Sequence, residues 1–89
     1  MLSFTVTIID PLGLHARPAS KIAQISSKFS SDIKIINLTK PGTANAKSIM
    51  NIMSLGVKTG SQITIEISGD DEQQALDAIK ASMIENNLI

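Results

Sequence analysis

The only histidine of the chain, His15, is followed by an arginine two residues later and by a proline directly after that arginine. Alternating polarity before it and helical spacing after it place His15 where a loop becomes a helix. The first turn of a helix has backbone N–H groups without intrahelical partners, which attract anions together with the positive end of the helix dipole. Pro18 suits such a turn because no N–H is needed there. The guanidinium of Arg17 offers a planar fork of donors, so these residues predict a phosphate site with an imidazole nucleophile.

The same residues also have a plainer explanation, in which a histidine caps the helix beside a solvated arginine. For an isolated His-x-Arg-Pro sequence this explanation is the commoner one. The rest of the chain has to decide between the two.

Length and composition indicate one globular domain spanning residues 1–89. Hydrophobic residues make up 43% of the chain and charged residues 18%, which is typical of a folded domain rather than a disordered segment. The 8 basic and 8 acidic residues leave no net charge, so we expect no binding of nucleic acid. Because the chain has no cysteine and a single histidine, we expect neither a metal site nor another cofactor.

The sequence also bears on membranes and targeting. No apolar run is long enough to span a bilayer, and the N-terminus lacks the pattern of a signal peptide. We therefore expect a cytoplasmic protein that does not insert into a membrane.

Around His15 the sequence alternates between strand and helix patterns. The first helix should end near Phe29, a second should be capped by Ser48, and the last should be capped by Asp70 with Gln73 at the capping-box position. Alternating strands suit an antiparallel sheet with one wet face, whose other face the helices would cover in an α+β domain of two layers. The expected order is strand 2–8, turn 10–13, helix 16–29, strand 33–35, turn 40–42, strand 43–44, a short helix after residue 48, strand 61–67 and a last helix after residue 70.

The short helix after Ser48 has more apolar residues than one buried face can hold. Ile52 should face inward, whereas Met50 and Met53 are candidates for the surface. An exposed methionine pair is adaptable and suits a surface that meets several partners. Ordinary core packing is an equal alternative for these two residues.

Two motifs resemble those of the HPr family, the histidine-containing phosphocarriers of the bacterial phosphoenolpyruvate-dependent sugar phosphotransferase system. The first is Gly-Leu-His-Ala-Arg-Pro-Ala at residues 13–19. The second is Ala-Lys-Ser-Ile-Met at residues 46–50, continued by Met-Ser-Leu-Gly at residues 53–56. Ser-Gly-Asp-Asp-Glu at residues 68–72 supports them, and the order and spacing of the elements match across essentially the whole chain. The resemblance favours a phosphate site at His15 over the plainer explanation of a capping histidine beside a solvated arginine.

This resemblance implies an open-faced β-sandwich, in which a four-stranded antiparallel sheet carries three helices on one face. It implies that His15 is phosphorylated on Nδ1 by enzyme I, with the group drawn from phosphoenolpyruvate. The group would then pass to a histidine of a sugar-specific enzyme IIA. Arg17 and the backbone N–H groups of Ala16 and Arg17 would assist at the phosphate. The chain would be a phosphotransfer intermediate rather than a stand-alone enzyme, and a monomer.

Ser48 matches the serine that an ATP-dependent HPr kinase/phosphorylase modifies in Gram-positive relatives. A mainly regulatory protein, acting through phospho-Ser48 on a catabolite-control transcription factor, is therefore one alternative. A plain α+β binding domain without phosphoryl chemistry is another. We expect partners to dock on the exposed parts of the first two helices around His15. The candidate docking residues are Ser20, Lys21, Gln24, Lys28, Ile49, Met50 and Met53.

Overall fold

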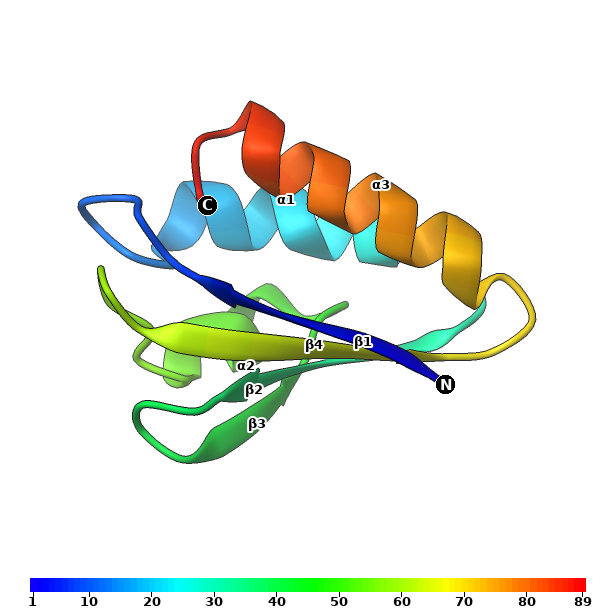
Figure 1. Cartoon of the computed structure of the whole chain (residues 1–89), viewed down its shortest axis with the longest axis horizontal. Coiled ribbons are helices and arrows are strands. Elements are labelled where there is room, and N and C mark those ends of the chain that lie inside the picture. Colours follow the sequence, from blue (N-terminus) through cyan, green and yellow to red (C-terminus); the bar gives the residue numbers. More distant parts are fainter.

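A computed structural model describes all residues 1–89 as seven elements that pack into two layers (Figure 1). The four strands form one sheet in the order β1-β4-β2-β3, and every neighbouring pair is antiparallel. The elements are β1 (Leu2–Thr7), α1 (Ala16–Ser26), β2 (Asp32–Asn37), β3 (Gly42–Asn45), α2 (Ile49–Ser54), β4 (Gln62–Ser68) and α3 (Glu72–Glu85).

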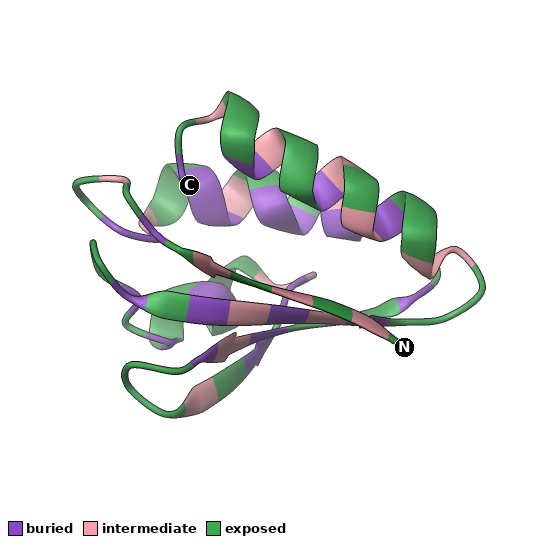
Figure 2. Ribbon diagram, viewed as in Figure 1, coloured by how far each residue is buried: buried purple, intermediate pink, exposed green.

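The register of the sheet separates its two faces by residue type. Ile35 of β2 lies opposite Ile65 of β4, and both side chains are fully buried beneath the helices. Thr5 of β1 lies opposite Thr64 of β4 on the other face, where their hydroxyl oxygens are 2.8 Å apart. The alternation of buried and open residues along β4 is visible in Figure 2. One face therefore belongs to the core and the other is left to water.

The helices supply the second wall of the core. α1 packs beside α3, and α2 packs against α1 and β3 (Figure 1). Ile22 of α1, Ile52 of α2 and Ile79 of α3 are each at most 1% exposed and belong to one core cluster with the buried isoleucines of the sheet. Burial of such side chains stabilises the fold by roughly 1.5–3 kcal/mol each. This packing fixes the start of α1 relative to the loops at its end of the sheet.

The structure confirms the α+β class, the open-faced sandwich and the order of the elements. Two predicted helix boundaries are wrong. α1 ends at Ser26, because the N–H groups of Lys28 and Phe29 bond to carbonyls three residues back, at 3.1 and 3.2 Å, in a tighter turn. The N-cap of α3 is Asp71 instead of Asp70, and its side chain makes no capping bond because it binds the turn after α1.

The length and composition of the helices can be compared with what a membrane crossing requires. No helix in the structure combines the length and the apolar character that a bilayer crossing requires.

Candidate functional site

The loop between β1 and α1 is fixed by the backbone of Gly13. The N–H of Gly13 donates to the carbonyl of Asp10 at 2.9 Å, which closes the predicted turn. Gly13 has φ +68°, and a Cβ at this position would lie 2.2 Å from the carbonyl oxygen of Val57. Leu14 follows with its side chain buried and its N–H donating to that same carbonyl at 3.1 Å. Only glycine fits both the positive φ and the close contact with the carbonyl of Val57. The loop therefore holds His15 in a defined position.

His15 lies where the loop becomes α1, as predicted, and occupies the N-cap position. Its backbone is extended and its carbonyl accepts from the N–H of Ala19 at 3.0 Å, but its imidazole makes no capping bond. The side chain is 34% exposed, so the ring can be reached from solvent. The N–H groups of Ala16 and Arg17 have no backbone partner, and the buried Pro18 has none to offer. The first turn thus presents two free N–H donors beside an imidazole that makes no hydrogen bond.

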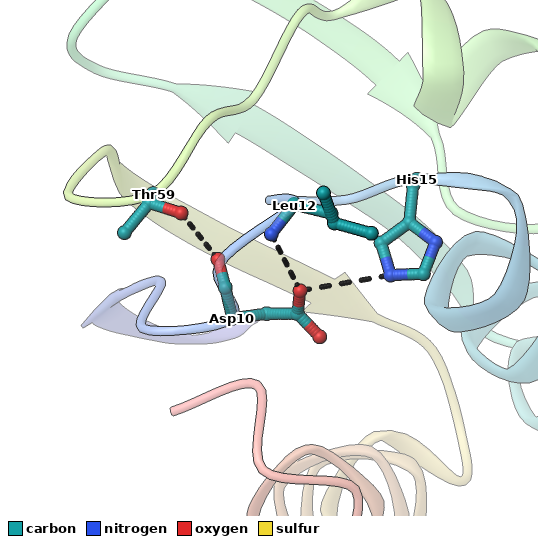
Figure 3. A network of polar contacts seen from close by, with 4 residues as sticks. All are labelled: Asp10, Leu12, His15 and Thr59. Atoms are coloured by element: carbon teal, nitrogen blue, oxygen red, sulfur yellow. Dashed lines mark hydrogen bonds and ion pairs between the residues drawn. The ribbon is translucent and has the colours of Figure 1, made fainter.

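Asp10 is a member of this site that the sequence did not reveal. Its Oδ1 lies 3.6 Å from Nε2 of His15, and the same oxygen accepts the N–H of Leu12 at 2.8 Å (Figure 3). Thr59 donates its hydroxyl to the backbone carbonyl of Asp10. The sequence signal was an aspartate before Pro-Leu-Gly, which predicts a turn but not the direction of the carboxylate.

A shallow depression of about 280 Å³ surrounds the imidazole. Arg17 and Lys21 bring cationic side chains to it, and both are exposed. The C-terminal segment closes one side of the depression, because Leu88 is 2% exposed and accepts the N–H of Ile9 at 2.7 Å. The place of this segment beside His15 could not be predicted from the sequence, since no local pattern connects it with the first loop. The lining residues are Asp10, His15, Arg17, Pro18, Lys21, Glu85, Asn86, Asn87 and Leu88.

Ser48 lies in a different hollow. A groove of about 680 Å³ runs between α1 and α2 and does not include His15. Ser48 is the predicted N-cap of α2, and its hydroxyl oxygen accepts the N–H of Asn51 at 3.3 Å. Lys47 lines the same groove and donates its ammonium to the carbonyl of Phe29 at 2.9 Å. The residues that line this groove are Ala23, Gln24, Ile25, Ser27, Lys28, Lys47, Ser48, Ile49 and Met50.

The apolar residues of α2 divide between core and surface. Ile52 is fully buried, whereas Met50 is 81% exposed and Met53 is 47% exposed. Both methionines therefore lie on the surface and not in the core. Of the predicted docking residues, Gln24, Lys28, Ile49 and Met50 meet in the groove, and Lys21 borders the depression at His15. Ser20, half-buried on α1, and Met53 line neither hollow.

Comparison with known proteins shows the family of the chain. A family model described as the PTS HPr component phosphorylation site matches residues 2–85. The phosphocarrier protein HPr of Mycoplasma capricolum is 53% identical over 89 residues, which cover 100% of this chain and 98% of that protein.

Solved structures agree with the sequence relatives. The histidine-containing phosphocarrier protein of a Mycoplasma superimposes with a TM-score of 0.94 at 50% identity, over 99% of this chain and 98% of that one. An HPr of Thermoanaerobacter tengcongensis, described as a dimer, superimposes with a TM-score of 0.69 at 45% identity, over 97% of this chain and 95% of that one. Because this relative is a dimer, the expected monomeric state of the present chain stays a prediction.

Proposed function

Because the chain belongs to the HPr family, we propose that it carries a phosphoryl group on Nδ1 of His15. Enzyme I, charged from phosphoenolpyruvate, would be the donor, and a histidine of a sugar-specific enzyme IIA would be the acceptor. The observation that carries this proposal is the partly exposed imidazole at the start of α1, beside the unpaired N–H groups of Ala16 and Arg17. We further propose that the chain works as a cytoplasmic monomer.

Phosphoryl transfer depends mainly on positioning and on stabilisation of charge. The extended backbone of His15 holds the ring at the end of the helix, where the two free N–H groups and the helix dipole favour the incoming phosphate. Arg17 is exposed and makes no salt bridge, so its guanidinium is available to the phosphate oxygens. A carrier must also release the group, and an open depression suits release better than a deep pocket.

The groove between α1 and α2 supports a docking surface for both partners. Met50 and Ile49 provide an exposed apolar centre, and Lys28 adds positive charge at its border. An acidic partner surface with an apolar centre would complement this arrangement. The groove lies at the end of α1 opposite His15, so a partner docked there would have to extend along α1 to bring its histidine to the imidazole.

One incubation tests the proposal. The chain would be mixed with enzyme I and labelled phosphoenolpyruvate, and the label would be tested for stability in acid and base. We expect acid-labile, base-stable label in the wild type and none in His15→Ala, whose fold should survive because the imidazole is partly exposed and makes no capping bond. Label on His15→Ala would refute the assignment of the nucleophile. An unlabelled wild type would favour the plain binding domain.

A second candidate role is regulation through Ser48. The observation that favours it is the half-buried hydroxyl at the N-cap of α2, next to the proposed docking surface. A kinase such as HPr kinase/phosphorylase would add a phosphate there, and a catabolite-control transcription factor would read it. Incubation with that kinase and ATP tests this role, since Ser48→Ala should then take no label.

A further inference from the structure

Asp10 is held more firmly than an ordinary loop carboxylate. Its Oδ1 accepts the N–H of Leu12 at 2.8 Å, which closes a turn within the loop. Its backbone carbonyl accepts both the N–H of Gly13 and the hydroxyl of Thr59, which belongs to the loop before β4. The preceding residue, Ile9, donates to Leu88 of the C-terminal segment at 2.7 Å. The loop before β4 and the C-terminal segment therefore hold the backbone at Asp10, and the N–H of Leu12 holds its carboxylate.

The carboxylate faces one particular edge of the imidazole. Asp10 is the only acidic residue in salt-bridge contact with His15, and it approaches Nε2, while Nδ1 lies on the edge of the ring turned away from Asp10 (Figure 3). The separation of 3.6 Å between Oδ1 and Nε2 is too long for a hydrogen bond but short enough for a strong electrostatic effect. The two side chains are 19% and 34% exposed, so solvent weakens this effect without abolishing it.

We propose that Asp10 is a positioning residue that keeps the proton of neutral His15 on Nε2 and so leaves the lone pair on Nδ1. A neutral imidazole carries one proton on either nitrogen, and a neighbouring carboxylate selects the tautomer whose N–H points toward it. The inference rests on the proposed function for its consequence in transfer. The tautomer itself can be measured without any partner protein.

The consequence for transfer is that no proton has to move. The Nδ1 lone pair forms the N–P bond while the bond between phosphorus and the donor nitrogen breaks, and the electron pair of that bond returns to the donor. The ring keeps its proton on Nε2 and gains a positive charge, which the carboxylate of Asp10 offsets. In the onward step the N–P bond breaks, its electron pair returns to Nδ1, and the ring is again neutral with the proton still on Nε2.

The side chain at residue 12 cannot take over this role. Leu12 contributes only its N–H to the site, and its apolar side chain is 73% exposed. Arg17 and Lys21, which also border the depression, are donors and cannot accept a proton from the ring. Glu85 also lines the depression but makes no ion pair with His15. Among these neighbours, Asp10 alone is placed to select the tautomer.

The test is a long-range ¹H–¹⁵N correlation spectrum of the ¹⁵N-labelled chain, recorded without partners at a pH where the imidazole is neutral. We expect the proton of His15 mainly on Nε2 in the wild type. In Asp10→Asn, whose amide oxygen can still accept the N–H of Leu12, the Nε2–H share should fall. Asp70→Asn serves as the matched control, because Asp70 is exposed before α3 and should leave the tautomer unchanged.

Transfer kinetics with phosphorylated enzyme I give the second measurement. Asp10→Asn should lower kcat by about threefold to fivefold, the range of a partly exposed ion pair, with KM little changed because Asp10 lies outside the proposed docking groove. Asp70→Asn should behave as the wild type. A wild type with its proton mainly on Nδ1, or an Asp10→Asn variant with an unchanged tautomer share, would overturn the inference. A wild type that takes no label overturns the proposed function instead, and the spectrum then still decides what Asp10 does to the ring.

Discussion

The carboxylate of Asp71 accepts two hydrogen bonds from Ser31, one from its hydroxyl and one from its N–H at 3.0 Å. A third comes from the N–H of Ser30 at 2.9 Å. The contact joins the turn after α1 to the first turn of α3, two segments about 40 residues apart in the chain. The hydrogen bonds from Ser31 and Ser30 lower the pKa of Asp71 to about 2 from an ordinary value of 3.8.

Asp71 should therefore make the fold sensitive to acid. Because its pKa is lower in the folded state, the contribution of Asp71 is present above about pH 3.8 and is lost as the pH falls through about 2. We expect Asp71→Asn to be less stable than the wild type at neutral pH and to lose less stability over that acid range. Urea unfolding followed by circular dichroism at a series of pH values measures this. Asp70→Asn is the control, and identical acid profiles for wild type and Asp71→Asn would contradict the prediction.

Asp71 also shows which features a sequence can predict. The strands follow from alternating isoleucines and threonines, and the N-cap of α2 follows from Ser48, because these signals lie within a few residues of the structure they specify. The prediction of Asp70 as the N-cap of α3 was wrong because Asp71 binds a distant turn, and no local sequence pattern contains that partner. The position of the C-terminal segment beside His15 could not be predicted for the same reason. Asp10 was missed although it is near in sequence, because the direction of its carboxylate depends on the turn at Leu12 and on Thr59.

Gly13 should be the least replaceable residue of the loop. In Gly13→Ala the new Cβ would meet the carbonyl of Val57 at 2.2 Å in a conformation with φ +68°. We expect a loss of roughly 3 kcal/mol in the free energy of unfolding, together with slower phosphorylation of His15. Gly60→Ala is a matched control, since Gly60 has φ +87° but no atom within 4 Å of an added Cβ. It should cost only about 1 kcal/mol. Equal losses in the two variants would show that the contact with Val57 relaxes freely.

Arg17 should act through the shape of its guanidinium as well as its charge. In Arg17→Lys the positive charge stays, but the planar fork of donors is lost. We expect slower transfer to and from His15, with His15 still labelled and the stability unchanged, because Arg17 is exposed. Rapid-quench kinetics in both directions measures the effect. Lys21→Ala, at the border of the same depression, should have the smaller effect, and a fully active Arg17→Lys would show that the backbone donors suffice.

Met50 should be central to docking. Its side chain is 81% exposed, so Met50→Glu should leave the fold intact while placing a negative charge in the proposed docking surface. Binding to enzyme I, measured by calorimetry, should weaken by at least tenfold, the size expected for a buried apolar anchor replaced by a charge. Ile36→Glu adds the same charge on the open face of the sheet and should leave binding unchanged. Equal binding by Met50→Glu and wild type would move the interface elsewhere.

Ser48 lies where a phosphate should alter docking more than folding. Its hydroxyl oxygen caps α2 by accepting the N–H of Asn51, so Ser48→Ala should lose about 1 kcal/mol of stability, whereas Ser48→Asp should keep the cap. A phosphate there adds up to about two negative charges and meets the positive end of the helix dipole, so phosphorylation should keep or slightly raise the melting temperature. Thermal unfolding of the wild type, phospho-Ser48, Ser48→Asp and Ser48→Ala, followed by circular dichroism, checks this order.

The same phosphate should slow phosphorylation of His15 by weakening the encounter with enzyme I. Ser48 borders the groove with Met50 and Lys28 but lies outside the depression at His15, so the added charge would face the partner and leave the imidazole undisturbed. Repulsion by an acidic partner raises the KM for the carrier while kcat changes little, and salt screens it because the groove is open to solvent. Phospho-Ser48, and Ser48→Asp to a lesser degree, should therefore show a raised KM that falls toward the wild-type value as salt increases. A change confined to kcat and indifferent to salt would mean that the phosphate distorts the site at His15, and regulation through docking would have to be abandoned.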